Sequence, residues 1–213
     1  MVAASWVAAT SAGPVPLPYL PNLLDPGACP APYPGAPVPP RGNEVVDWIT
    51  EATRHDRTIV GAIPPVFERY ATVVIPDNDS AKARADAALV GILQAHSSTR
   101  SWWLGYLDTG VADVVEPAAP RVSAYVGWPY ALMQGGPQQA LTSRSHTTPW
   151  HSALPELLFP ADRTWLVSTM WDDDWRCVGG PAALVDALLI HPELEARSVL
   201  PDDDATPPGH HEG

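Results

Sequence analysis

Three consecutive aspartates stand between two tryptophans in the segment WDDDW, residues 171–175. Carboxylate oxygens are the ligands that hard divalent cations such as Mg²⁺ and Ca²⁺ prefer. Successive side chains of a strand point to opposite faces, so at most two of Asp172, Asp173 and Asp174 converge on one ion without a turn. The spacing differs from that of an EF-hand loop, and aspartate is favoured in β-turns for its local hydrogen bonds. We therefore interpret the triplet as a solvated turn and keep a metal site as the alternative.

Two histidines lie upstream in the segment SRSHTTPWHSALPE, and Glu156 follows the second one by five residues. Imidazole and carboxylate groups together could bind zinc or transfer protons. The spacing of five, with Pro149 between the histidines, fits no helix face, so two separate surface histidines are the simpler interpretation. If the histidines met the aspartates in space, a metal-dependent hydrolase would be the leading enzyme hypothesis. Its metal ligands would be His146, His151, Asp172 and Asp174.

The cysteine and glycine positions that follow give little indication of a catalytic or phosphate-binding site. Cys177 lies between apolar neighbours on an expected strand and is typical of a buried small hydrophobic residue. Gly179 and Gly180 precede Pro181 at a strand-to-helix junction, where helix amides can bind anions. Pro181 removes one of those donors and no phosphate-binding motif is present, so the glycines are expected to let the chain turn. The sequence predicts no cofactor, and it lacks the G-x-S-x-G motif of serine hydrolases.

Nine tryptophans against two phenylalanines give the chain an unusual aromatic composition. Most of them are expected in the core, because each indole buries a large apolar area. Trp102 and Trp103 are adjacent and should face opposite sides of a strand, which could leave one of them exposed. The functional hypothesis is an aromatic-lined groove with acidic neighbours. The candidate binding residues are Trp102, Trp103, Trp128, Trp171, Trp175, Asp172, Asp173 and Asp174.

The hydrophobic pattern predicts both helices and strands in the segments around these residues. Helices are expected over residues 43–55 with Asn43 as the N-cap, over 80–96 with Ser80 as the cap, and over 181–190. Ala88, Ile92 and Ala95 are placed on the buried face of the second helix. One helical turn is expected through residues 67–70. Strand-like runs follow at 72–75, 101–108, 121–128, 130–135, 164–171, 175–178 and 195–199.

These elements predict an α+β fold, a single domain with helices packed on a five- or six-stranded, mainly antiparallel sheet. The domain is expected over residues 43–200. Residues 1–42 are read as a proline-rich arm, since prolines at this density cannot form a helix or a central strand. The leucines and tyrosines of the arm suggest that it lies against the domain or awaits a partner, so a homo-oligomer through the arm is one option. Residues 201–213 are expected to be a disordered acidic and histidine-containing tail.

The charge of the chain disfavours several classes of function. With 24 acidic and 12 basic residues the formal net charge is −12, and Lys82 is the only lysine. Nucleic acids and anionic membranes both require positive charge, so neither is an expected partner. No segment has the length of a transmembrane helix. The apolar run near the N-terminus lacks preceding basic residues and makes only a weak secretory signal, so the expected location is the cytoplasm.

Three segments resemble an uncharacterised family of actinobacterial proteins with no assigned activity: IPPVFERYATVVIP, WHSALPELLFPADRTWLVSTMWDDDW and VGGPAALVDALLIHPELEARSV. The resemblance covers about residues 60–200 and implies no catalytic residue or cofactor. We therefore expect a non-catalytic, protein-binding or regulatory module with a basic or neutral protein partner, as in immunity proteins. The metal-dependent hydrolase is the alternative.

Overall fold

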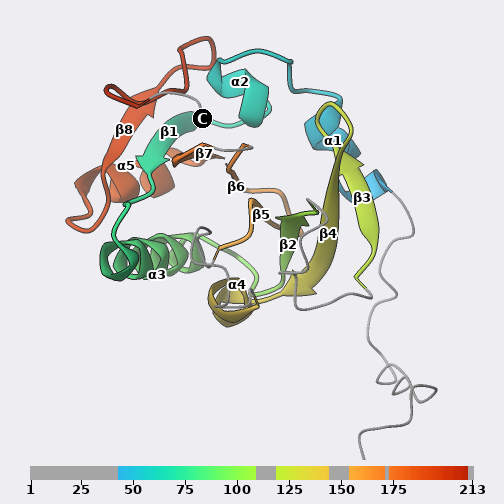
Figure 1. Cartoon of the computed structure of the whole chain (residues 1–213), viewed down its shortest axis with the longest axis horizontal. Coiled ribbons are helices and arrows are strands. Elements are labelled where there is room, and N and C mark those ends of the chain that lie inside the picture. Colours follow the sequence, from blue (N-terminus) through green and yellow to red (C-terminus); the bar gives the residue numbers. More distant parts are fainter. Residues whose placement is uncertain (1–42, 109–118, 144–153, 171–172, 211–213) are drawn as a thin grey trace, which may run out of the picture. The chain divides into compact units, whose positions relative to one another are not determined.

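A single antiparallel sheet of eight strands carries the fold of this chain, whose computed structural model describes residues 43–108, 119–143, 154–170 and 173–210 (Figure 1). The spatial order is β3-β4-β2-β5-β6-β7-β1-β8. The strands are β1 (Arg69–Val74), β2 (Trp102–Leu107), β3 (Arg121–Ala124), β4 (Trp128–Gly135), β5 (Leu157–Pro160), β6 (Leu166–Ser168), β7 (Trp175–Gly180) and β8 (Ala196–Val199). The antiparallel α+β architecture is confirmed, whereas the expected count of five or six strands is wrong.

The additional strands come from short runs with weak sequence signals. Residues 157–160 read LLFP, a continuous apolar run that periodicity cannot distinguish from a buried helix. All four residues are buried because both faces of the sheet are covered. Residues 121–128 contain a turn as well as a strand: Tyr125 and Gly127 have φ angles of 54° and 96°. A turn with these φ angles separates β3 from β4, which begins at Trp128, as expected for a two-stranded hairpin.

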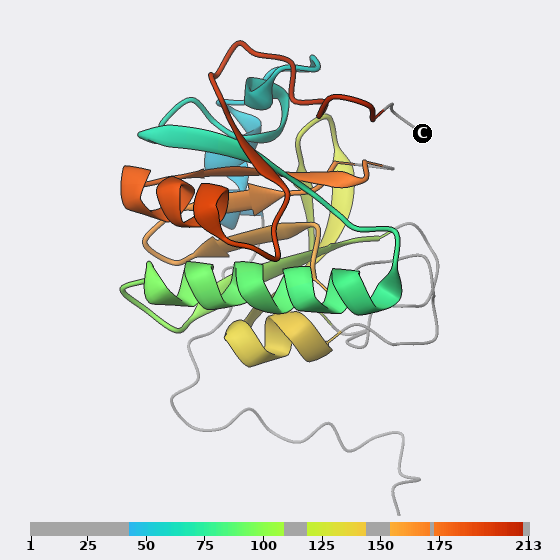
Figure 2. The same ribbon diagram turned by 90° about the vertical axis from the view of Figure 1, so that its left-hand side faces the viewer.

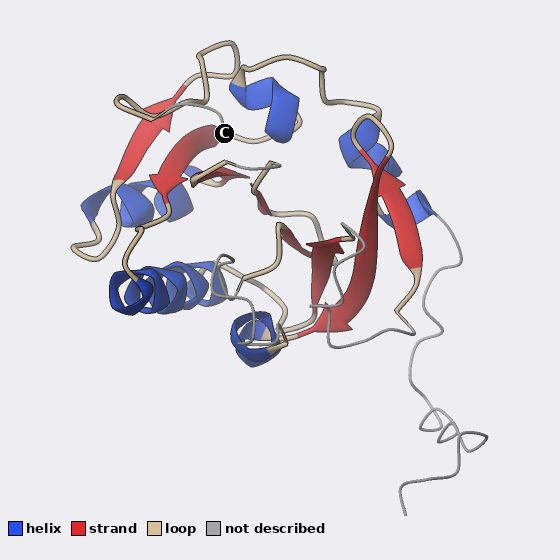
Figure 3. Ribbon diagram, in the orientation of Figure 1, coloured by secondary structure: helices blue, strands red, loops and turns tan. Residues whose placement is uncertain are grey.

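Helices cover both faces of the sheet. The larger ones, α3 (Asp79–Ala95), α4 (Pro137–Thr142) and α5 (Ala182–Ile190), lie along one side (Figure 2). The other side is covered by η1 (Asn43–Val45), α1 (Asp47–Thr50) and α2 (Ile59–Ala62) (Figure 3). The expected helix over 43–55 is thus broken at Val46 and ends early, and Asn43 accepts the Ser123 N–H instead of capping it. Residues 69 and 70 begin β1 where a helical turn was expected.

Each face of the sheet has its own hydrophobic core, and the two adjacent tryptophans of β2 belong to different cores. Trp102 is fully buried beneath the larger helices, where its ring meets that of Trp165 edge-on at 5.0 Å. Trp103 points to the opposite face and is only 8% exposed. Opposite orientation is therefore confirmed, and both side chains are buried. The described helices include none that is long and apolar enough to cross a membrane.

Helix α3 packs with a different face from the one expected. Its buried residues are Ala85, Asp86, Leu89, Val90 and Leu93, whereas Ala88 and Ile92 are half-buried and Ala95 is exposed. The buried Asp86 carboxylate lies 2.6 Å from the Arg176 guanidinium of β7, and each side chain is 1% exposed. An alanine-rich helix has little apolar contrast between its faces, so its periodicity did not reveal this orientation.

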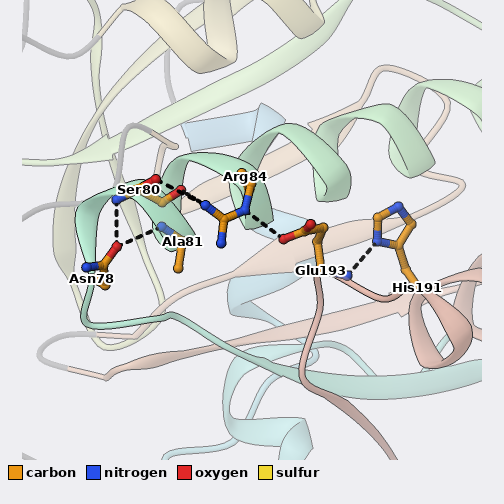
Figure 4. Close-up of polar contacts among 6 residues, drawn as sticks. All are labelled: Asn78, Ser80, Ala81, Arg84, His191 and Glu193. Carbon is orange, nitrogen blue, oxygen red and sulfur yellow. Dashed lines mark hydrogen bonds and ion pairs between the residues drawn. The ribbon is translucent and has the colours of Figure 1, made fainter.

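The N-terminus of α3 is capped by Asn78 and not by Ser80 (Figure 4). The Asn78 side-chain oxygen accepts the backbone N–H groups of Ser80 and Ala81 at 3.0 and 3.1 Å. The Ser80 hydroxyl instead accepts a hydrogen bond from Arg84, which also forms an exposed ion pair with Glu193 at 2.9 Å. The helix therefore begins at Asp79, one residue before the serine that the sequence suggested as its cap.

Replacing Asn78 by alanine should lower the free energy of unfolding by about 1 kcal/mol, because two helix N–H groups lose their acceptor. Urea denaturation of the full chain measures this change. Ser80→Ala is the matched control and should change stability by less than half as much, since its hydroxyl contacts only an exposed arginine. Equal losses for the two variants would contradict the assignment of the cap.

Candidate functional site

A pocket of about 430 Å³ opens on the sheet face that carries α1 and α2. We call it the Tyr125 pocket. Four segments line it: the stretch between Thr50 and Ala62, the hairpin turn from Tyr125 to Trp128, the neighbouring ends of β6 and β7, and residues 205–206 of the C-terminal segment. Its size lies in the range of small-ligand sites, and its lining combines aromatic rings with hydroxyl and charged groups.

The wall between α1 and α2 is joined to the C-terminal segment by backbone hydrogen bonds. The Ala205 N–H donates to the Arg57 carbonyl and the Ile59 N–H to the Asp203 carbonyl, both at 3.0 Å. A side chain at Gly61 would place its Cβ 2.2 Å from the Asp56 carbonyl oxygen, so the turn before α2 requires glycine. Residues 201–210, which we expected to be disordered, therefore form part of the pocket wall.

Arg197 of β8 holds this C-terminal wall against the sheet. Its guanidinium donates to the Thr72 hydroxyl at 3.1 Å and to the carbonyl oxygens of Asp204 and Thr206 at 2.7 and 2.8 Å. Charged donors make stronger hydrogen bonds than neutral ones, so one arginine can order several residues of the segment. The pocket wall thus depends on a contact between residues far apart in the sequence.

Tyr125 forms the floor of the pocket in a fixed orientation. Its backbone N–H donates to the Thr50 hydroxyl at 3.1 Å, and its phenol donates to the Ala62 carbonyl at 3.1 Å. The Ser168 hydroxyl lies 2.6 Å from the phenol oxygen. Burial raises the pKa of Tyr125 well above its usual range, although the Ser168 hydrogen bond lowers it in part. The phenol therefore stays neutral and acts as a hydrogen-bonded support, not as a base.

Cys177 contributes an unreactive thiol to the same pocket. Its side chain is 1% exposed, and burial raises the pKa of the thiol far above its usual range, with the Asp173 carboxylate adding to the shift. The thiolate is the nucleophilic form of cysteine, so a thiol that stays protonated does not attack a substrate. The residue is a buried small side chain, as the sequence suggested.

The structure places the candidate binding residues in different environments. Trp128, Asp173 and Trp175 line the Tyr125 pocket, with Trp128 half-buried and Trp175 2% exposed. The Asp173 N–H donates to the Met170 carbonyl at 3.3 Å. Trp171 and Asp172 lie outside the described residues. Trp102 and Trp103 belong to the two cores and do not reach this pocket.

The structure describes only one of the four residues of the alternative metal site. Asp174 lies with one carboxylate oxygen 2.6 Å from Nδ1 of His210. His146, His151 and Asp172 fall outside the described residues. Within the described ranges, no three His, Cys, Asp or Glu side chains gather as metal ligands would. Glu156, which follows the two histidines, accepts the Leu107 N–H at 3.0 Å at the end of β2.

Several residues of the Tyr125 pocket were not identified from the sequence. Tyr125 and the threonines of its wall have no motif, and the C-terminal contribution was assigned to a tail. One signal was present: Gly127 lies inside the strand-like run over residues 121–128, and a glycine within such a run can mark a turn.

Comparison with protein-family models, with curated proteins and with solved structures finds no match to this chain. The resemblance to an actinobacterial family therefore stays a prediction.

Proposed function

We propose that this protein is a non-catalytic binding module of a regulatory kind, and that the Tyr125 pocket is its ligand site. One observation carries the proposal: a cavity of about 430 Å³ is lined by three aromatic side chains together with hydroxyl groups. Cavities of this size with an apolar lining and a few polar groups are the usual form of small-ligand sites.

The buried thiol and phenol of the pocket support binding over catalysis by these two groups. Cys177 and Tyr125 both have their pKa raised by burial, so each is neutral at physiological pH. A neutral thiol and a neutral phenol can line a site but cannot act as an activated nucleophile or a general base. The alternative hydrolase requires His146, His151 and Asp172, which lie outside the described residues, and it stays an untested prediction.

The exposed apolar residues favour a concave site over a flat protein interface. Among the described residues, the large exposed apolar side chains are Val66, Val126, Ile190 and Leu200, which come from separate elements. Scattered apolar side chains are normal on a protein surface, whereas a docking face is a contiguous patch. Val126 differs from the other three because it stands at the Tyr125 pocket.

The proposal can be tested by closing the pocket. Val126 is 53% exposed and lines the pocket, so Val126→Trp adds bulk there without disturbing a core. Ligand-observed NMR with a mixed set of neutral, cationic, anionic, aromatic and aliphatic fragments reports binding at millimolar concentration. We expect fragments that bind the unmodified chain to lose at least tenfold in affinity for Val126→Trp.

Val66→Trp is the matched control, because Val66 is 65% exposed and is not part of the pocket. It should bind the same fragments as the unmodified chain. The proposal is wrong if no fragment of any class binds, or if Val126→Trp and Val66→Trp bind equally well. If both variants melt at a lower temperature than the unmodified chain, a loss of affinity reflects destabilisation of the fold and not a closed pocket.

A further inference from the structure

We infer that the ligand of the Tyr125 pocket is a small, uncharged aromatic molecule. This inference rests on the proposed function, since it names the class of ligand that the same pocket would take. Three features carry it: Arg54 and Asp56 at the pocket already interact with other groups of the chain, the walls are rich in aromatic rings and sulfur, and the central ring is already held in place.

Arg54 and Asp56, two charged residues of the pocket lining, already interact with other groups of this chain. Arg54 forms an ion pair with Asp202 at 3.0 Å, across the wall that joins the α1–α2 connection to the C-terminal segment. The Asp56 carboxylate accepts the backbone N–H and the hydroxyl of Thr58 at 3.0 and 2.6 Å. Arg197 donates to two carbonyl oxygens of the C-terminal segment. A charged ligand would compete with these contacts, whereas an uncharged one leaves them intact.

The walls offer π faces and polarizable sulfur. The rings of Tyr125 and Trp128 lie 6.3 Å apart at an angle of 58°, and Trp175 and Met170 also line the pocket. Aromatic rings pack edge-on or offset against one another, and thioether sulfur makes favourable contacts with ring edges. An aromatic ligand would gain both kinds of contact. An aliphatic ligand of the same volume would gain only the apolar burial.

The position of Tyr125 favours a rigid ligand. Hydrogen bonds that Tyr125 donates to Thr50 and Ala62, and its hydrogen bond with Ser168, fix both ends of the residue before any ligand arrives. A preorganised site loses little conformational entropy on binding. The hydroxyls of Thr53 and Thr206 belong to the same lining and can serve a hydroxyl or N–H substituent on the ring.

Four probes of similar size separate the two parts of the inference. Titrations of the full chain use p-cresol, benzoate, benzylamine and 4-methylcyclohexanol, followed by ligand-observed NMR. We expect the Kd of p-cresol to be at least tenfold lower than that of each of the other three. Trp128→Ala should weaken p-cresol binding about three- to tenfold, and Trp128→Phe should restore most of the affinity because it keeps a ring.

Each outcome decides one point. Benzoate or benzylamine binding as tightly as p-cresol would overturn the uncharged class, and equal binding of 4-methylcyclohexanol would overturn the aromatic class. In both cases the proposed function stands if Val126→Trp still abolishes binding. If none of the four probes binds, the inference is wrong, and the wider fragment set decides whether the proposed function fails with it.

Discussion

Replacing Asp86 by alanine should lower the free energy of unfolding by about 3 to 5 kcal/mol, the largest single effect we expect in this chain. Asp86 and Arg176 are each 1% exposed and their charged groups lie 2.6 Å apart. Removal of the carboxylate takes the Asp86 counter-charge away from the buried guanidinium, and breaking a buried ion pair from one side is costly. Urea denaturation of the full chain gives the change in stability.

Two controls separate the buried charge from the loss of side-chain volume. The double variant Asp86→Leu/Arg176→Met removes both charges and fills the space, so it should be much more stable than Asp86→Ala. Glu193→Ala breaks the exposed Arg84 pair, whose side chains are 56% and 44% exposed, and should cost less than 1 kcal/mol. A loss below 1 kcal/mol for Asp86→Ala would show that the ion pair does not stabilise the fold.

This ion pair also shows where prediction from sequence stops. Several elements were predictable from the sequence: helix α5 follows Pro181 as the glycine-proline signal indicated, and β2 coincides with an aromatic run. Asp86, in contrast, resembles any solvated acid of an alanine-rich helix. Its burial depends on Arg176, which is 90 positions away in the sequence. Local patterns predict an element, whereas its orientation depends on such distant partners.

The candidate site, too, was predictable from the sequence only in part. Trp128, Asp173 and Trp175 were proposed from the sequence as residues of an aromatic-lined groove with acidic neighbours, and all three line the Tyr125 pocket. Its remaining walls come from the α1–α2 connection and the C-terminal segment, which backbone hydrogen bonds join to each other. No local signal marks such a pocket, since its shape exists only after the sheet has formed.

Substituting Gly179 by alanine should destabilise the fold by about 1 to 3 kcal/mol, the range typical of overpacking a core. The sequence suggested that this glycine lets the chain turn, but it lies within β7, where it pairs with Tyr70 and Leu166 on either side. A Cβ here would stand 2.4 Å from Cδ2 of Phe67 and 2.6 Å from Cγ2 of Ile63. Glycine is required for close packing, not for its dihedral freedom.

The matched control for this substitution is Gly91→Ala in helix α3. No atom lies within 4 Å of a Cβ built at Gly91, so the change should stabilise the helix by about 0.5 to 1 kcal/mol. Opposite signs for the same chemical change, measured by urea denaturation, would separate packing from backbone entropy. Phe67→Leu removes the ring that the new methyl group meets, so Gly179→Ala should cost less in that background than in the unmodified chain. Equal costs in the two backgrounds would mean that the Phe67 ring is not what excludes a side chain at position 179.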